Sequence, residues 1–239
     1  VLLPEGALPF LWGRSYGLEA PLLRAVQAAK VPLWAGVFMP QGEGYHQSLL
    51  SLTADGVVSG QYNKVKLVPL GEYLPFEQWI KPVLSRLSPL KVGMIAGENH
   101  QRFDTAIGRA IVGICYDSVF SELFRFQAAA GGQFILSVAN NDPFGARMMG
   151  QHHALDVLRA IETDRWLIRA TNTGISAVID PQGHSQWISP TNVSLTHIAK
   201  IERRTTQTLY VRVGNWFLPL CLAFSIALWF KYRDRPNLI

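Results

Sequence analysis

Cysteine and charge are both scarce in this sequence. The two cysteines among 239 residues, Cys115 and Cys221, are too few for a disulfide framework, and the chain is long enough to bury a core without one. Charged residues make up 16% of the chain, below the roughly 25% usual in soluble domains, whereas apolar residues make up 49%. The composition therefore excludes both a disulfide-stapled miniature domain and an intrinsically disordered chain.

Basic helices and metal-ligand clusters are absent as well. The net charge is +5, but the lysines and arginines are scattered, so we expect no nucleic-acid partner. An excess of basic over acidic residues is equally compatible with binding to an anionic membrane surface. His152 and His153 have no further histidine or acidic cluster at ligand spacing, so we interpret them as helix-surface residues. No phosphate-binding glycine loop or dinucleotide motif occurs, and we expect neither a metal nor a cofactor.

A long uncharged stretch lies near the C-terminus, between Arg212 and Lys231. Its 18 residues would cover about 27 Å as a helix, close to the roughly 30 Å hydrocarbon core of a bilayer. Trp216 and Trp229 stand near its ends, as interfacial anchors do. We predict a transmembrane helix over residues 213–231; a buried core helix is the alternative.

The flanking charges indicate an orientation for this helix. Lys231, Arg233 and Arg235 follow it directly, which by the positive-inside rule predicts a cytoplasmic tail over residues 232–239. Residues 1–212 would then lie on the extracytoplasmic side. The chain opens on Val-Leu-Leu-Pro-Glu, which reads as the end of a strand, so we expect it to be the C-terminal portion of a longer protein.

Short runs of branched apolar residues alternate with helix-length segments, a pattern typical of an α/β fold with helices covering the outer faces of its sheets. Turn residues at 54–56 and 180–183 predict two hairpins. The region 72–97 is rich in proline and glycine and is interpreted as a long loop, with apolar residues from Leu74 to Leu87 forming a lid. The expected strands are 32–38, 47–53, 57–62, 110–114, 134–139, 167–170, 176–179 and 208–213, and the expected helices are 18–30, 118–130 and 147–163.

Three reactive side chains stand at the ends of apolar runs: Glu5, Lys64 and Cys115. Glu5 alone would read as a solvated turn residue, and a lone cysteine after a buried strand as an inert small hydrophobe. A lysine that leaves a strand and is followed eight residues later by Glu72 is less usual. Cys115 precedes an expected helix, whose dipole, together with a nearby ammonium group, would favour a thiolate.

These segments resemble the nitrilase superfamily, which carries glutamate, lysine and cysteine in that order. Within it, Tyr-Asn-Lys at 62–64, Gly-Glu-Tyr at 71–73, Ile-Cys-Tyr at 114–116 and the stretch 169–180 are similar to the bacterial apolipoprotein N-acyltransferase family. The resemblance implies an α-β-β-α sandwich over residues 1–212 that lacks the superfamily's first strand and helix. It places this domain on the periplasmic side of the bacterial inner membrane, in a protein with several membrane helices.

The resemblance also implies roles for individual residues. Cys115 matches the nucleophile, Glu5 the general base and Lys64 the group that stabilises the oxyanion, together with the backbone N–H of Tyr116. Glu72, Tyr116 and Asp117 are expected to bind substrate, although Asp117 stands where the family often has glutamate. Pro143 stands where the family has tryptophan.

The implied reaction transfers the sn-1 acyl chain of a phospholipid to the cysteine, forming a thioester. The chain then passes to the N-terminal amine of a diacylated prolipoprotein. Two other interpretations stay open: a membrane-tethered amidase or hydrolase that uses the same three residues with water as acceptor, and a non-enzymatic binding module.

Overall fold

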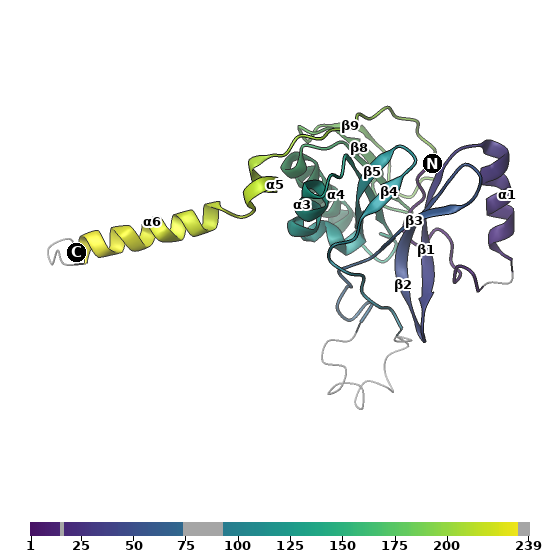
Figure 1. Cartoon of the computed structure of the whole chain (residues 1–239), viewed down its shortest axis with the longest axis horizontal. Helices are drawn as coiled ribbons and strands as arrows, with labels where there is room; N and C mark the ends of the chain where they lie inside the picture. Colours follow the sequence, from purple (N-terminus) through teal and green to yellow (C-terminus); the bar gives the residue numbers. More distant parts are fainter. Residues whose placement is uncertain (15–16, 74–92, 234–239) are drawn as a thin grey trace.

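Two β-sheets pack face to face in the computed structural model, which describes residues 1–14, 17–73 and 93–233. Helix α1 lies beside the smaller sheet, and α3 and α4 lie against the larger one (Figure 1). The core between the sheets brings Trp34 and Leu49 together with Ile111 and Phe134, and the Trp34 and Phe134 rings lie 6.3 Å apart. The predicted α-β-β-α sandwich is confirmed.

The smaller sheet is an antiparallel meander of three strands, β1 (Leu33–Gln41), β2 (Gly44–Leu52) and β3 (Val58–Asn63). Alternate residues divide its two faces: Trp34 faces the core between the sheets, whereas Leu33 and Ala35 pack on the side of α1 (Glu19–Ala29). The N-terminal residues run parallel to β1, with bridges from Leu2 to Trp34 and from Leu11 to Phe38. This N-terminal segment extends the edge of the smaller sheet, and Glu5 lies on it.

The larger sheet has six strands in sequence order, and its three strands β5, β6 and β7 are parallel. Helices α3 (Ser121–Ala129) and α4 (Ala146–Thr163) connect the parallel strands. Because the carboxyl ends of parallel strands meet at one edge of a sheet, Cys115 after β5 and Asn140 after β6 are brought to the same edge. The strands are β4 (Phe103–Thr105), β5 (Gly108–Ile114), β6 (Phe134–Ala139), β7 (Leu167–Thr171), β8 (Ala177–Ile179) and β9 (Ser185–Ile188).

Most of the expected elements occur, and both predicted hairpins are confirmed by the antiparallel pairs β2–β3 and β8–β9. The short strands β4 and β9 were not predicted. The strand expected at 208–213 is wrong, because that segment forms helix α5 (Leu209–Val213), whose first turn is capped by the Thr208 hydroxyl accepting from the backbone N–H of Val211. The lid expected between Leu74 and Leu87 lies outside the described residues.

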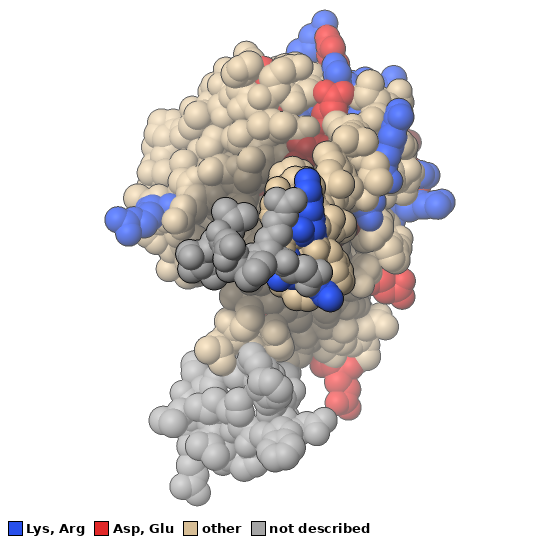
Figure 2. Space-filling model, turned by 90° about the vertical axis from the view of Figure 1, so that its left-hand side faces the viewer, with Lys and Arg blue, Asp and Glu red and all other residues tan. Residues whose placement is uncertain are grey.

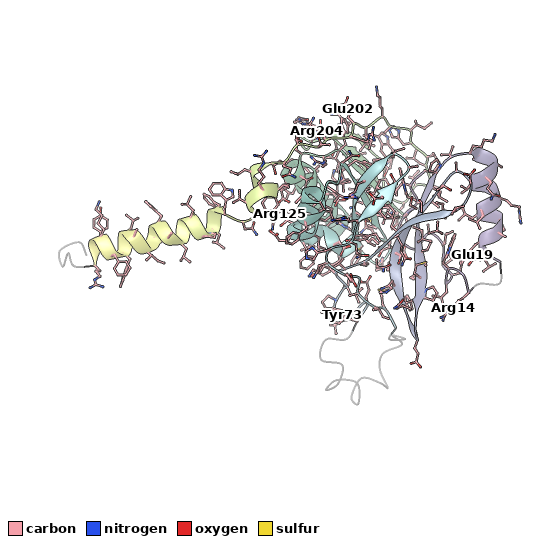
Figure 3. The ribbon with its side chains drawn as sticks, viewed as in Figure 1. Arg14, Glu19, Tyr73, Arg125, Glu202 and Arg204 are labelled. Carbon is pink, nitrogen blue, oxygen red and sulfur yellow. The ribbon has the colours of Figure 1, made fainter. Side chains whose placement is uncertain are left out.

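The C-terminal helix is shorter than the stretch 213–231 predicted for it. Gly214 adopts φ +70° and ends α5, so that α6 runs only over Phe217–Tyr232, 16 residues or about 24 Å. It projects away from the sandwich, and none of its residues is buried (Figures 1 and 3). Across residues 1–14, 17–73 and 93–233, no helix has the combined length and hydropathy needed for a membrane crossing.

Gly36 leaves the room that the Glu5 segment needs beside β1. A Cβ atom at this position would lie 2.2 Å from the carbonyl oxygen of Pro4 and 2.7 Å from the Cα of Glu5. Backbone atoms cannot yield as the end of a flexible side chain can, so a methyl group here would push Glu5 out of its place. Gly36 is therefore a requirement of the site as well as of the sheet.

We predict that Gly36→Ala lowers the free energy of unfolding by about 1–3 kcal/mol, the usual cost of overpacking, and displaces Glu5. Gly150→Ala is the matched control, because a Cβ there meets nothing within 4 Å and removal of a helical glycine stabilises by up to about 1 kcal/mol. Urea unfolding of both variants checks the prediction. Equal stability of the two variants would contradict it.

Candidate active site

Lys64 leaves β3 and places its ammonium group between two carboxylates. Its Nζ lies 3.0 Å from Oε1 of Glu5 and 2.5 Å from Oε1 of Glu72, and its side chain is fully buried. Burial alone would lower the pKa of Lys64, but the two carboxylates outweigh burial and raise it. Lys64 is therefore a permanent cation at neutral pH.

Each carboxylate is held at its other oxygen by a backbone N–H group. Oε2 of Glu5 accepts from the N–H of Asn140, at the end of β6, over 2.6 Å. Oε2 of Glu72 accepts from the N–H of Val68 over 2.9 Å, within the turn that links Lys64 to Glu72. The three charged groups thus have defined orientations, and Glu5 connects the edge of the smaller sheet to the edge of the larger one.

Cys115 follows β5 and opens a short 3-10 helix (Cys115–Val119). Its backbone adopts φ +51°, a left-handed conformation that costs a residue with a side chain about 1 kcal/mol or more and that is often found at active sites. The charges of Glu5, Lys64 and Glu72 all act on its thiol, so the structure brings the three predicted catalytic residues and Glu72 into one site.

The expected thiolate is wrong for the resting site. Burial and the negative charge of Glu5 raise the pKa of the Cys115 thiol to about 12, and the nearby Lys64 ammonium offsets only part of this increase. The 3-10 helix also delays the following α-helix, which begins at Ser121 and not near Ser118. At neutral pH the cysteine is a thiol, so a nucleophilic role would require a base.

Asp117 joins the cysteine turn to the lysine segment. Its Oδ2 accepts from the N–H of Ile114 over 3.1 Å, and its Oδ1 accepts from the N–H of Lys66 over 2.8 Å. The side chain is fully buried, and burial raises its pKa to about 7 even though both backbone donors favour the ionised form. Both oxygens thus face protein backbone.

Tyr116 and Lys66 are half-buried, and both side chains lie against the ring of Phe120. The Tyr116 ring meets the Phe120 ring edge to face at 5.2 Å, and the Lys66 ammonium lies 4.9 Å from the centroid of the Phe120 ring. Tyr73, the third residue of the Gly-Glu-Tyr motif, is exposed and lies on the lower side of the molecule in Figure 3. Of the residues expected to bind substrate, Tyr116 and Glu72 thus retain some exposure.

His152 does not have the surface position expected for it. It is buried, and its Nε2 lies 3.0 Å from the carbonyl oxygen of Cys115, whereas His153 is half-buried beside Ser185. One feature of the sequence could have indicated that His152 is buried: it lies four residues before Asp156 on α4, which places both on one helix face. No group of three or more possible metal ligands occurs in the part of the chain that the structure describes.

The sandwich and the buried Glu–Lys–Cys group define a class of protein. The chain belongs to the carbon–nitrogen hydrolase family, whose model matches residues 1–213. It is 53% identical to the apolipoprotein N-acyltransferase of Nostoc sp. over 229 residues, and these residues make up 96% of this chain and 45% of that protein. The corresponding protein of Thermosynechococcus vestitus is 52% identical over 222 residues, which cover 93% of this chain and 43% of that protein. The chain thus spans less than half the length of these relatives.

Solved structures share the fold at low sequence identity. A mutant amidase from Nesterenkonia sp., with an acetamide group attached covalently to its active-site cysteine, has a TM-score of 0.64 at 19% identity, covering 92% of this chain and 82% of that chain. A carbon–nitrogen hydrolase from Helicobacter pylori has a TM-score of 0.57 at 15% identity, covering 91% of this chain and 76% of that chain. These likenesses support the architecture alone.

The raised pKa of Cys115 predicts the pH dependence of its reactivity. A thiol with a pKa of about 12 has a thiolate fraction that grows about tenfold with each pH unit below that value, so alkylation by iodoacetamide should accelerate steadily from pH 7 to pH 10. Rates measured by mass spectrometry of the Cys115 peptide check this. A plateau reached below pH 9 would contradict it.

Glu5→Gln separates the acidity of the thiol from catalysis. Because Glu5 raises the pKa of Cys115, its neutralisation should lower that pKa and speed alkylation at pH 8. If Glu5 is the general base that the resemblance implies, acylation of Cys115 should nevertheless slow by about 10²- to 10⁴-fold, because the group that takes the thiol proton is lost. Both rates are measured on the same preparation. A parallel change in alkylation and acylation would show that Glu5 is not the base.

Proposed function

We propose that this chain is the catalytic domain of an apolipoprotein N-acyltransferase. The observation that carries the proposal is the Lys64 ammonium held between Glu5 and Glu72 beside Cys115, in a chain 53% identical to a protein of that name. A thioester suits transfer to an amine, because amines attack thioesters readily. The proposed acyl donor is a phospholipid and the proposed acceptor is a diacylated prolipoprotein.

The first half-reaction forms the thioester. Glu5 accepts the thiol proton as the Cys115 sulfur attacks the sn-1 ester carbonyl of the phospholipid. The Lys64 ammonium and the Tyr116 N–H stabilise the oxyanion. The C–O bond then breaks, the leaving alkoxide takes the proton from Glu5, and a lysophospholipid departs.

The second half-reaction uses the same groups in reverse. The α-amino nitrogen of the acceptor's diacylglyceryl-cysteine attacks the thioester carbonyl, and Glu5 removes a proton from that nitrogen. The C–S bond breaks, the sulfur takes up the proton, and the product carries an amide. Glu72 holds Lys64 in place. Asp117 does not contact substrate: both of its oxygens accept from backbone N–H groups, and it positions the cysteine turn.

We further propose that residues 1–212 act at the periplasmic face of the inner membrane and that α6 is the membrane-contacting element. Helix α6 is 16 residues long, carries no charge before Lys231 and exposes its apolar side chains along its whole length. Viewed from the α6 end, the body has a broad uncharged area; lysine and arginine side chains lie mainly along its right-hand side, with aspartate and glutamate among them, and one further basic group lies at the left-hand edge (Figure 2). This arrangement suits a surface that faces lipid.

Incubation of the full-length protein with phospholipid vesicles tests the proposed reaction. We expect an acyl adduct on Cys115 that hydroxylamine removes and that a diacylated lipopeptide converts into a triacylated product. Cys221, exposed on α6, is the internal control and should stay unmodified. Release of free fatty acid with no triacylated lipopeptide would instead support a hydrolase with water as acceptor, and the absence of any Cys115 adduct would contradict both enzymatic proposals.

A further inference from the structure

A buried polar chain beneath the active site ends on the peptide bond that follows the nucleophile. Asp156, on α4, pairs with Arg169, on β7, and accepts hydrogen bonds from the hydroxyls of Ser118 and Ser137. Arg169 donates from its second terminal nitrogen to Oδ1 of Asn141 over 3.2 Å. The proposed acyl transfer uses none of these side chains directly.

The chain continues through Asn141 to His152. Because Oδ1 of Asn141 accepts from Arg169, its amide nitrogen is directed to Nδ1 of His152, over 3.1 Å. Burial and the positive charge of Arg169 lower the pKa of His152 to about 4, so the imidazole is neutral and carries one N–H. With Nδ1 accepting, that N–H must be on Nε2, which donates to the carbonyl oxygen of Cys115 over 3.0 Å.

The peptide unit that receives this bond is the one that would carry the oxyanion donor. In a planar trans peptide the C=O and N–H bonds point in opposite directions. Holding the Cys115 carbonyl toward His152 therefore aims the Tyr116 N–H the other way. The first N–H groups of a 3-10 helix have no acceptor within that helix, so the Tyr116 N–H is available to a substrate oxygen. A hydrogen bond to the carbonyl also polarises the same N–H group.

We propose that His152 is a positioning residue for the oxyanion site: its Nε2–H holds the Cys115–Tyr116 peptide so that the Tyr116 N–H faces the acyl oxygen. The inference rests on the proposed acyl transfer for its natural substrate, but it applies to any acylation of Cys115. It assigns His152 no contact with substrate and no proton transfer. The hydrogen bond from His152 adds to the contacts that hold the left-handed backbone of Cys115, a conformation that is unfavourable on its own.

The test compares two reactions of Cys115 in the full-length protein. Acylation by a p-nitrophenyl ester passes through an oxyanion, whereas alkylation by iodoacetamide does not. We expect His152→Leu to slow acylation by about 10- to 10²-fold, less than the roughly 10²- to 10³-fold that follows complete loss of a donor, and to change alkylation by less than about threefold. In kinetics with phospholipid the loss should appear in kcat and not in KM.

Three further variants serve as controls. His152→Gln places an amide N–H close to the position of Nε2 and should restore acylation, whereas the shorter side chain of His152→Asn should not; this pair replaces His152→Leu if that variant does not fold. His153→Leu removes the neighbouring, half-buried histidine and should leave both rates unchanged.

The outcomes separate the inference from the proposed function. Normal acylation in His152→Leu, or a parallel fall in acylation and alkylation, would overturn the role of His152, since the second result indicates a general loss of structure. Failure of the wild-type protein to acylate a lipopeptide, with its p-nitrophenyl ester reaction intact, would overturn the proposed acyl acceptor and leave the comparison of variants valid.

Discussion

The buried Lys64 ammonium is the interaction on which the rest of the site depends. Removing a cation from water costs several kcal/mol, and only close, well-oriented opposite charges offset that cost. Glu5 and Glu72 supply these charges from segments 59 and 8 residues away in sequence. The ion group therefore ties the N-terminal edge, the end of β3 and the turn after it into one unit, and Glu5 extends the connection to the end of β6 through Asn140.

The same arrangement explains the state of the nucleophile. Two carboxylates near a buried thiol make its ionisation harder, and one ammonium offsets only part of that effect, so the site stores a neutral thiol beside a base. In the proposed acyl transfer, proton removal accompanies attack, when negative charge moves to an oxygen that Lys64 would stabilise. The strained turn at Cys115 is held from both sides, by Asp117 through backbone N–H groups and by His152 through the carbonyl.

Apolar periodicity and turn residues, which are local signals, predicted most strands and both hairpins. The layers of the sandwich and the meeting of Glu5, Lys64 and Cys115 were instead implied by the resemblance to the nitrilase superfamily, because contacts between segments far apart in sequence leave no local signal. Sequence reasoning failed at 208–213, where alternating residues read as a strand but Thr208 caps a helical turn, and at His152, whose burial depends on packing against the distant Cys115 turn. It also favoured a thiolate, because it weighed one lysine without the burial and the two carboxylates around it.

A double-mutant cycle between Lys64 and Glu5 tests the central claim most directly. The free energy of unfolding is measured for wild type, Lys64→Met, Glu5→Gln and the double variant. Each single change leaves a buried charge without one of its partners and should destabilise by about 3–5 kcal/mol, whereas the double variant should be more stable than the sum of the two losses by at least about 1.5 kcal/mol. Additive losses would show that the ion pair does not hold the site together.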